Sequence, residues 1–348
     1  MNQLVKIIFL FTIGMTVISC TKNDNNTEPL RNFTEQYTKD LASIETYLHT
    51  HYIDVVNNPG STDDQDVTYT LIPPGGTQTS IWDQTTYPLQ TRLVTVKQND
   101  INVTYTIYYL KLRVGSGPNS KSPSNVDRVF TSYRGEYIYS STETVAGASV
   151  TTIKSTEFEE LINPQSYFNL TGVIRGWSEI FPQFTTGSYI GNTDGTVTYN
   201  DFGAGVMFLP SGLAYFSSPQ AGIPAYSPLI FNFKLYEIQR VDHDADGIYS
   251  YQEDLNNDGY VLTLPEGVAN PDNTNAPGTA FLISTSPDRY SDEDEVPDFL
   301  DADDDGDFFT TASEIKNSVT GEDYPFNDIP NCGGTGNGKK KHLDPSCH

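Results

Sequence analysis

The chain has 348 residues, which is long enough for one or two domains with hydrophobic cores. Acidic residues outnumber basic ones by 45 to 20 and give a formal net charge of −25. This charge repels phosphate backbones and argues against nucleic acid as a partner. Hydrophobic residues make up only 36%, while Tyr, Phe, Gly and Pro are abundant; this composition favours strands and turns over long helices.

The N-terminus has the features of an export signal. Lys6 precedes an apolar run over residues 7–18, which is too short for a transmembrane helix, and we predict a signal peptide over 1–19. The run Val17-Ile18-Ser19-Cys20 resembles a bacterial lipobox. That resemblance implies acylation of Cys20 and a lipid anchor in the cell envelope, on its periplasmic face or outer surface. An ordinary signal peptide with an incidental cysteine is the alternative.

The region before residue 100 is predicted to hold a tether, one helix and irregular β-structure. Residues 20–32 are polar and suit a lipid-anchored tether. From Phe33 to Tyr52 apolar residues recur at helical spacing, which predicts an amphipathic helix. The sequence leaves open whether this helix packs on the following domain or dimerises the chain. Turn signals alternate with short apolar runs through the rest of the 33–99 region.

Residues 100–240 are predicted to form an α+β domain. The only convincing helix there runs from Gly176 to Phe184. Many strands around one short helix predict an antiparallel sheet half-wrapped around that helix, with an apolar floor near its start. The expected strands are Val103–Val114, Arg128–Tyr139, Ser149–Lys154, Val206–Leu209 and Leu229–Ile238.

Several short motifs follow one another in this domain. They are Tyr133-Arg134-Gly135, Val173-Ile174-Arg175-Gly176-Trp177, Gly187, Leu209-Pro210-Ser211-Gly212-Leu213-Ala214-Tyr215, Gly222-Ile223-Pro224 and Leu229-Ile230-Phe231. In this order they resemble the FKBP family of peptidyl-prolyl cis/trans isomerases, over roughly residues 105–240. Gliding-motility-associated isomerases are similar exported lipoproteins of this family.

The resemblance implies a set of pocket residues, with the Trp177 indole as the floor. The residues carried over are Tyr133, Phe158, Glu159, Val173, Ile174, Trp177, Tyr215, Ile223 and Phe231. The chain departs from the family where Phe216 replaces a common Gly and Ser166 stands in place of a pocket aromatic. Residues 142–154 and 191–205 look inserted. Without the resemblance, the same aromatics would be read as ordinary core residues.

The implied reaction is rotation about Xaa-Pro bonds of unfolded or exported polypeptides, as a folding helper. It needs no catalytic cofactor, because an apolar pocket that desolvates the amide lowers a barrier that comes from C–N resonance. The alternative is a catalytically weak FKBP-like binding module in a calcium-stabilised surface lipoprotein.

After Arg240 the composition changes to Asp, Asn and Gly, and residues 241–320 are expected to bury little core. Two sets of residues there have the spacing of EF-hand-like calcium loops, at positions 1, 3, 5, 7 and 12. The first is Asp242, Asp244, Asp246, Ile248 and Glu253, and the second is Asp303, Asp305, Asp307, Phe309 and Glu314. Structural Ca²⁺ is therefore expected, and a solvated acidic spacer is the alternative.

Two features of the acidic segment are weaker. A partial loop begins at Asp254, and the acidic residues of 292–301 resemble thrombospondin-type-3 repeats. Phe308 occupies the position where the second full loop usually has Gly. In the tail, residues 321–348, Cys332 and Cys347 are predicted to form a disulfide or to remain free thiols.

Overall fold

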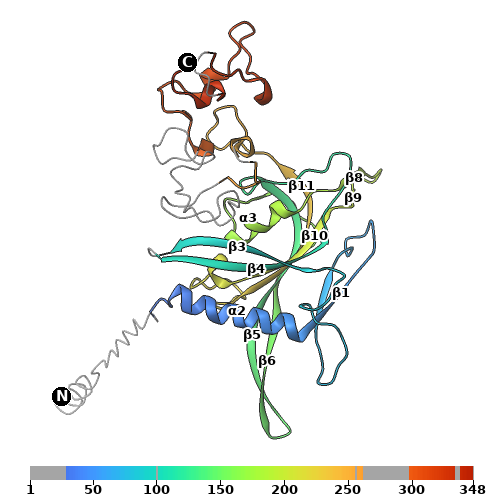
Figure 1. The fold of residues 1–348 in the computed structure, drawn as a ribbon. Coiled ribbons are helices and arrows are strands. Elements are labelled where there is room, and N and C mark those ends of the chain that lie inside the picture. Colours follow the sequence, from blue (N-terminus) through green and yellow to red (C-terminus); the bar gives the residue numbers. More distant parts are fainter. Residues whose placement is uncertain (1–28, 99–100, 255–256, 262–297, 334–337, 348) are drawn as a thin grey trace, which may run out of the picture. The chain divides into compact units, whose positions relative to one another are not determined.

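The structure is a computed structural model that describes residues 29–98, 101–254, 257–261, 298–333 and 338–347 (Figure 1). The predicted signal peptide, Cys20 and most of the thrombospondin-like acidic run lie outside these residues. Residues 1–31 and 32–348 are separate units, and the second is described here. No helix in the described ranges is long and apolar enough to cross a membrane.

The α-helices in the described part of the second unit are α2 (Phe33–Thr50), α3 (Arg175–Ile180) and α4 (Thr311–Glu314). Its strands are β1 (His51–Val55), β2 (Val67–Leu71), β3 (Leu89–Gln98), β4 (Ile101–Arg113), β5 (Arg128–Val145), β6 (Ala148–Leu161), β7 (Phe168–Asn169), β8 (Ser188–Gly191), β9 (Val197–Asn200), β10 (Gly203–Leu209) and β11 (Leu229–Gln239).

One antiparallel sheet dominates the fold. Its strand order is β3-β4-β10-β11-β5-β6, and β7 pairs with β5. A predominantly antiparallel sheet with few helices confirms the α+β prediction in outline. The two apparent insertions become hairpins: residues 142–154 extend the β5–β6 pair, and β8–β9 forms a separate two-stranded sheet.

Both faces of the central strands are buried, and this differs from the expectation of one buried face. Side chains alternate along a strand, so Tyr105 and Ile107 of β4 join the core on the α3 side. Tyr108 and Leu110 join a second core with α2. The second face is covered because α2 and the β1–β2 hairpin pack on it (Figure 1).

Helix α2 confirms the predicted N-terminal helix, although the prediction ran two residues too far. Asn32 caps it, since its side chain accepts hydrogen bonds from Thr34 N and Glu35 N. The helix ends where His51 begins β1. Its apolar face, including Ile44 and Tyr47, is fully buried against the sheet within the chain.

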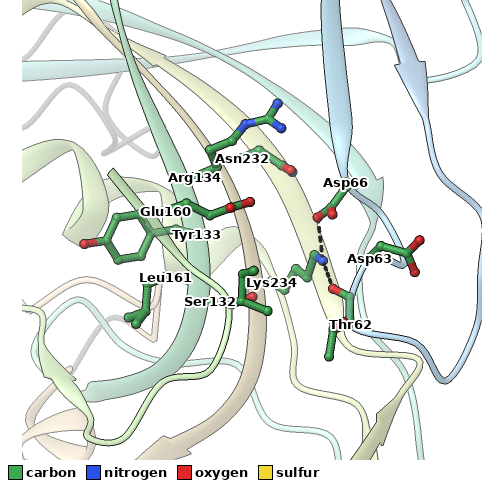
Figure 2. Close-up of a pocket in the computed structure, with 11 residues that line it drawn as sticks. Thr62, Asp63, Asp66, Ser132, Tyr133, Arg134, Glu160, Leu161, Asn232 and Lys234 are labelled. Carbon is green, nitrogen blue, oxygen red and sulfur yellow. Dashed lines mark hydrogen bonds and ion pairs between the residues drawn. The ribbon is translucent and has the colours of Figure 1, made fainter. Parts of the chain in front are cut away.

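The α2 side of the sheet also encloses a small polar cavity of about 100 Å³ beneath residues 62–66 (Figure 2). Lys234 lies 2.6 Å from Asp66, and Asn232 accepts a hydrogen bond from the Val67 N–H at 3.2 Å. Figure 2 shows the Tyr133 ring turned away from these groups, as strand alternation requires. These buried polar side chains therefore tie the entry to β2 onto the sheet.

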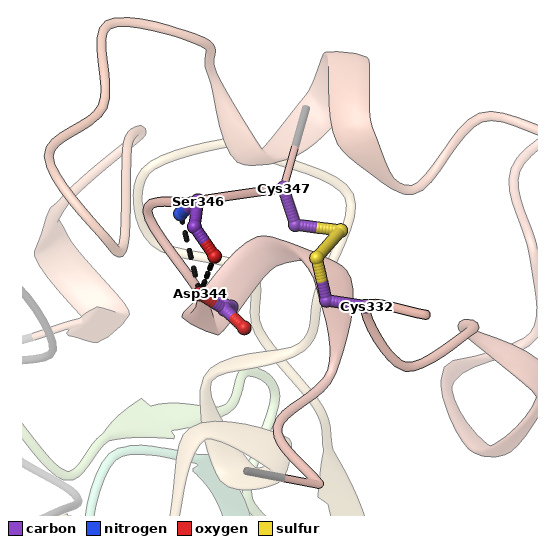
Figure 3. The surroundings of a disulfide bond; sticks show 4 residues. All are labelled: Cys332, Asp344, Ser346 and Cys347. Carbon is purple, nitrogen blue, oxygen red and sulfur yellow. Dashed lines mark hydrogen bonds between the residues drawn. A yellow bond between two sulfur atoms is a disulfide. The ribbon is translucent and has the colours of Figure 1, made fainter. Parts of the chain in front are cut away.

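The acidic segment contains two small clusters of buried apolar residues. Ile248, Ile315 and Ile329 form one buried cluster, and Phe299 packs in another. A disulfide joins Cys332 and Cys347, which decides between the two states that the sequence left open (Figure 3). Each cluster has only three buried residues, in agreement with the small core expected of residues 241–320.

Candidate functional site

A cavity of about 470 Å³ opens between the sheet and the start of α3. It is lined by Tyr133, Phe158, Glu159, Phe168, Gly172, Val173, Ile174, Arg175, Trp177, Ala214, Tyr215 and Phe231. Eight of the nine residues carried over from the family pattern line it, although they come from separate parts of the chain. The ninth, Ile223, is buried in the same core cluster but does not line the cavity.

Trp177 is the centre of the aromatic packing in this cavity. Its ring meets Tyr133 and Phe231 edge to face, with centroid distances of 5.0 and 5.4 Å. Helix α3 can bring the indole close to the sheet because Gly176 touches Leu209; a Cβ there would lie 2.5 Å from a Leu209 methyl. The indole is only 4% exposed, and its Nε1 has no hydrogen-bond partner among the described residues.

A β-bulge brings two consecutive residues, Phe158 and Glu159, to the cavity. Gly135 pairs with Glu159 while the next residue of β5 pairs with Glu157, so Phe158 is the extra residue. A bulge re-aims side chains that would otherwise alternate between the faces. Gly135 is required opposite it, since a Cβ there would approach the Phe158 ring to 2.3 Å.

The polar groups of the cavity divide into one pair and one available donor. The Tyr133 hydroxyl donates to Glu159 at 2.7 Å. Burial, followed by the Glu159 charge, raises the pKa of Tyr215, so its hydroxyl keeps its proton. No described residue hydrogen-bonds the Tyr215 hydroxyl. The cavity thus offers an O–H donor beside an apolar, aromatic floor.

Phe168 is the pocket aromatic that sequence reasoning missed. Ser166 is exposed and lies outside the lining, whereas the Phe168 ring is 5.6 Å from that of Trp177. The short pairing of β7 with β5 holds Phe168 in place. The sequence does contain the expected pocket aromatic, but two residues after Ser166. Gly172, Arg175 and Ala214 also line the cavity without having been predicted to do so.

The other departure, Phe216, has a structural explanation. Its φ is +46°, a left-handed conformation that explains why Gly is common there. Its ring stacks on Phe33 of α2 at 4.2 Å and meets Tyr226 edge to face at 5.0 Å. The aromatic contact with the N-terminal helix therefore offsets the backbone cost and fixes the loop that carries Tyr215.

The first acidic loop has the backbone of a cation-binding turn. Gly247 has a φ of +101°, and its N–H donates to Asp242 at 3.2 Å. The Ile248 N–H donates to Asp246 at 2.7 Å. Carboxylate oxygens of Asp242, Asp244 and Asp246 lie within 4.8 Å of one another. Such a cluster of hard oxygen ligands suits calcium.

The second acidic loop repeats this geometry. Phe308 has a φ of +73°, and its N–H donates to Asp303 at 2.9 Å, as Gly247 does in the first loop. Asp303, Asp305 and Asp307 also gather within 4.8 Å. Phe308 therefore takes the left-handed conformation that Gly normally supplies, and its side chain is 95% exposed.

The glutamate at position 12 of each loop lies outside the cluster formed by that loop's three aspartates. Glu253 and Glu314 are both buried, and no described residue hydrogen-bonds their carboxylate oxygens. Burial and the neighbouring carboxylates raise the pKa of Glu314 to about 8.

The partial loop at Asp254 has the same turn as the two full loops, since the Gly259 N–H donates to Asp254 at 2.7 Å.

Comparison with protein families matches residues 243–339 to the BamM C-terminal family. This match covers the acidic loops apart from Asp242 and adds no support for calcium binding. A search of curated proteins finds no match.

Solved structures with similarity to part of the chain include a peptidyl-prolyl cis-trans isomerase, FkpA and a domain of FKBP42. A peptidyl-prolyl cis-trans isomerase from Pseudomonas syringae pv. tomato is 23% identical, covering 38% of this chain and 76% of that one, with a TM-score of 0.26. FkpA from Escherichia coli is 23% identical over 38% and 48%, with a TM-score of 0.24. The N-terminal domain of FKBP42 from Arabidopsis thaliana is 12% identical over 38% and 86%, with a TM-score of 0.25.

Proposed function

We propose that the chain is a peptidyl-prolyl cis/trans isomerase of the FKBP type that acts on Xaa-Pro bonds of exported polypeptides. One observation carries the proposal: eight residues expected from the family pattern line a single aromatic cavity around Trp177. The cavity is large enough for a prolyl ring and its neighbouring peptide groups, and it offers a hydroxyl donor at its edge.

The prolyl ring would lie against the Trp177 indole and the Phe231 ring, which both line the cavity. The barrier to rotation, roughly 18–20 kcal/mol, comes from resonance that is strongest in the planar, more polar amide. An apolar cavity disfavours that charge separation and so favours the twisted amide. The Tyr215 hydroxyl and the Ile174 N–H would hold the flanking carbonyls, and Glu159 would keep Tyr133 oriented.

The energy required of these contacts is modest. An acceleration of about a thousandfold corresponds to about 4 kcal/mol of preferential binding to the transition state. Desolvation by the aromatic walls and one or two hydrogen bonds to carbonyls are of this order. Neither a nucleophile nor a metal is required in this proposal.

The test is isomerisation of a short Xaa-Pro peptide by the full chain. We expect Trp177→Leu to lower kcat/KM by about tenfold or more, equivalent to about 1.4 kcal/mol, and Tyr215→Phe to lower it severalfold. Tyr189→Phe is the matched control, because Tyr189 is an exposed tyrosine of β8. Proline-peptide binding without acceleration would instead support the alternative, a catalytically weak binding module.

We further propose that the protein works at the cell envelope, held by a lipid on Cys20. The lipobox-like sequence supports this, and the BamM C-terminal match favours an envelope setting. Its partners would be unfolded, proline-containing exported chains. Metabolic labelling with a palmitate analogue, compared with Cys20→Ala, tests the anchor; equal labelling of the two would contradict it.

Calcium is proposed as a structural ligand of the two acidic loops. Each loop gathers three carboxylates, whose mutual repulsion a divalent cation would relieve. A ligand that binds only the folded state stabilises it by about 2.7 kcal/mol at a hundred times its Kd. Thermal unfolding in millimolar calcium and in chelator tests this, and identical melting temperatures would exclude calcium binding.

A further inference from the structure

Acidic residues from the two loops also meet each other. Asp246 and Glu253 belong to the first loop, whereas Asp304 lies in the second. One carboxylate oxygen from each of these three residues lies within 4.8 Å of the other two. Asp304 lies outside the motif that contains Asp246 and Glu253, so only the folded chain brings it to them.

Asp304 faces the first loop, whereas the residues on either side of it belong to the carboxylate cluster of the second loop. Asp303 and Asp305 turn toward their own loop. The Asp304 N–H donates to the Thr311 hydroxyl at 3.1 Å, which fixes the backbone at that position. Glu253, in turn, groups with Asp304 and Asp246.

The three carboxylates are buried, and those of Glu253 and Asp304 have no compensating hydrogen bond among the described residues. Glu253 is 3% exposed and Asp304 is 2% exposed. All four carboxylate oxygens of these two residues lack a hydrogen-bond partner among the described residues. In the same part of the chain, no Lys, Arg or His forms a salt bridge with either of them or with Asp246. Buried charges left in this state cost several kcal/mol each.

The pKa values agree with this picture of crowded negative charge. Burial, reinforced by the neighbouring carboxylates, raises the pKa of Glu253 to about 10 and that of Asp304 to about 11. The charge of Asp298, itself buried, contributes to both shifts. Either of two changes would neutralise this charge: protonation of the carboxyl groups, or binding of a cation between them.

We propose that Asp246, Glu253 and Asp304 bind a further divalent cation, of the calcium type, between the two loops. Asp246 also belongs to the first loop's cluster, so its carboxylate would bridge this ion and the ion of that loop. Carboxylate oxygens are ligands for hard cations, and water would complete the coordination. The inference is independent of isomerase activity.

A cation at this site would link the two loops to each other. His243 and Phe299 already meet edge to face at 5.7 Å, which shows that the two segments pack on each other. An ion shared by Glu253 and Asp304 adds an ionic link to this small apolar contact. Folding of the C-terminal segment would then depend on cation binding as one unit.

Asp304→Asn separates a cation from a proton as the neutralising species. Thermal unfolding of the full chain is measured with calcium and with chelator. For a cation site, the variant should be more stable than wild type in chelator, because repulsion is relieved, and should gain less stability from calcium. If the carboxyls are simply protonated, the isosteric amide should leave the stabilisation by calcium unchanged, and this result would overturn the proposal.

Ion counting by native mass spectrometry makes the test specific to this site. We expect Asp304→Asn and Glu253→Gln to bind one calcium fewer than wild type, and the double variant to lose no more than Glu253→Gln alone. Asp328→Asn, which neutralises an exposed carboxylate of the same segment, is the control. An unchanged count in folded Asp304→Asn refutes the shared site even if the two loops themselves bind calcium.

Discussion

The buried carboxylate of Asp40 accepts two hydrogen bonds from Ser211, one from its backbone N–H at 2.8 Å and one from its hydroxyl at 2.5 Å. Asp40 belongs to α2, and Ser211 begins the turn that leads into Tyr215 of the cavity. The N-terminal helix therefore holds the pocket loop by a polar contact as well as by packing.

Removal of this contact should disturb the cavity. We expect Asp40→Ala to cost about 1–3 kcal/mol of stability, because the buried Ser211 N–H loses its acceptor, and to lower kcat/KM for a proline peptide. Ser211→Ala removes only the hydroxyl bond and should have a smaller effect. Activity is measured where every variant is folded; loss of stability with unchanged kcat/KM would limit Asp40 to a structural role.

The stacking of Phe33 on Phe216 should appear as energetic coupling. Phe33→Ala is expected to destabilise the chain, and the cost should shrink by about 0.5–1.5 kcal/mol when Phe216 is already Gly. The physical reason is that Gly accepts the left-handed φ without needing the stacked ring. A double-mutant cycle in urea measures this coupling, and additive effects of the two substitutions would contradict it.

The left-handed backbone conformation of Phe308 should weaken calcium binding by the second acidic loop. Phe308→Gly should tighten calcium binding there by about five- to thirtyfold, since a side chain in this conformation costs roughly 1–2 kcal/mol. Phe308→Ala is the matched control, because it removes the exposed ring but keeps the Cβ. Calorimetric titration measures the affinities. Equal gains in both variants would trace the effect to the ring instead of the backbone.

Acid should weaken the packing of α2 through His51. Burial lowers the pKa of this imidazole below its usual 6.5, and its ring stacks on Tyr47 at 3.8 Å. The unfolded chain therefore binds the proton first as pH falls through about 6.5, and stability declines until the folded-state pKa is passed.

His51→Phe, which keeps an aromatic ring on Tyr47, should lose less stability than wild type between pH 7 and pH 5. His49→Phe, which removes an exposed imidazole, is the control. Parallel pH profiles for wild type and His51→Phe, measured by urea unfolding, would rule out this role.

Local sequence patterns predicted several elements of the fold and of the candidate site. The helical spacing from Phe33 predicted α2, and the motif around Trp177 predicted the start of α3 and the pocket floor. The Asp-x-Asp-x-Asp spacing predicted two loops whose turns the structure contains. These features could be predicted because each depends on residues within one or two turns of chain.

The remaining features depend on contacts between distant segments, which the sequence does not encode locally. The position of Phe168 against Trp177 follows from the pairing of β7 with β5. The contact of Phe33 with Phe216 follows from how α2 crosses the sheet. The sequence by itself determined which side chains were available for a pocket and for cation loops. Tertiary structure alone decided that Glu253 faces Asp304, because packing at that junction brings together two carboxylates that lie far apart in an extended chain.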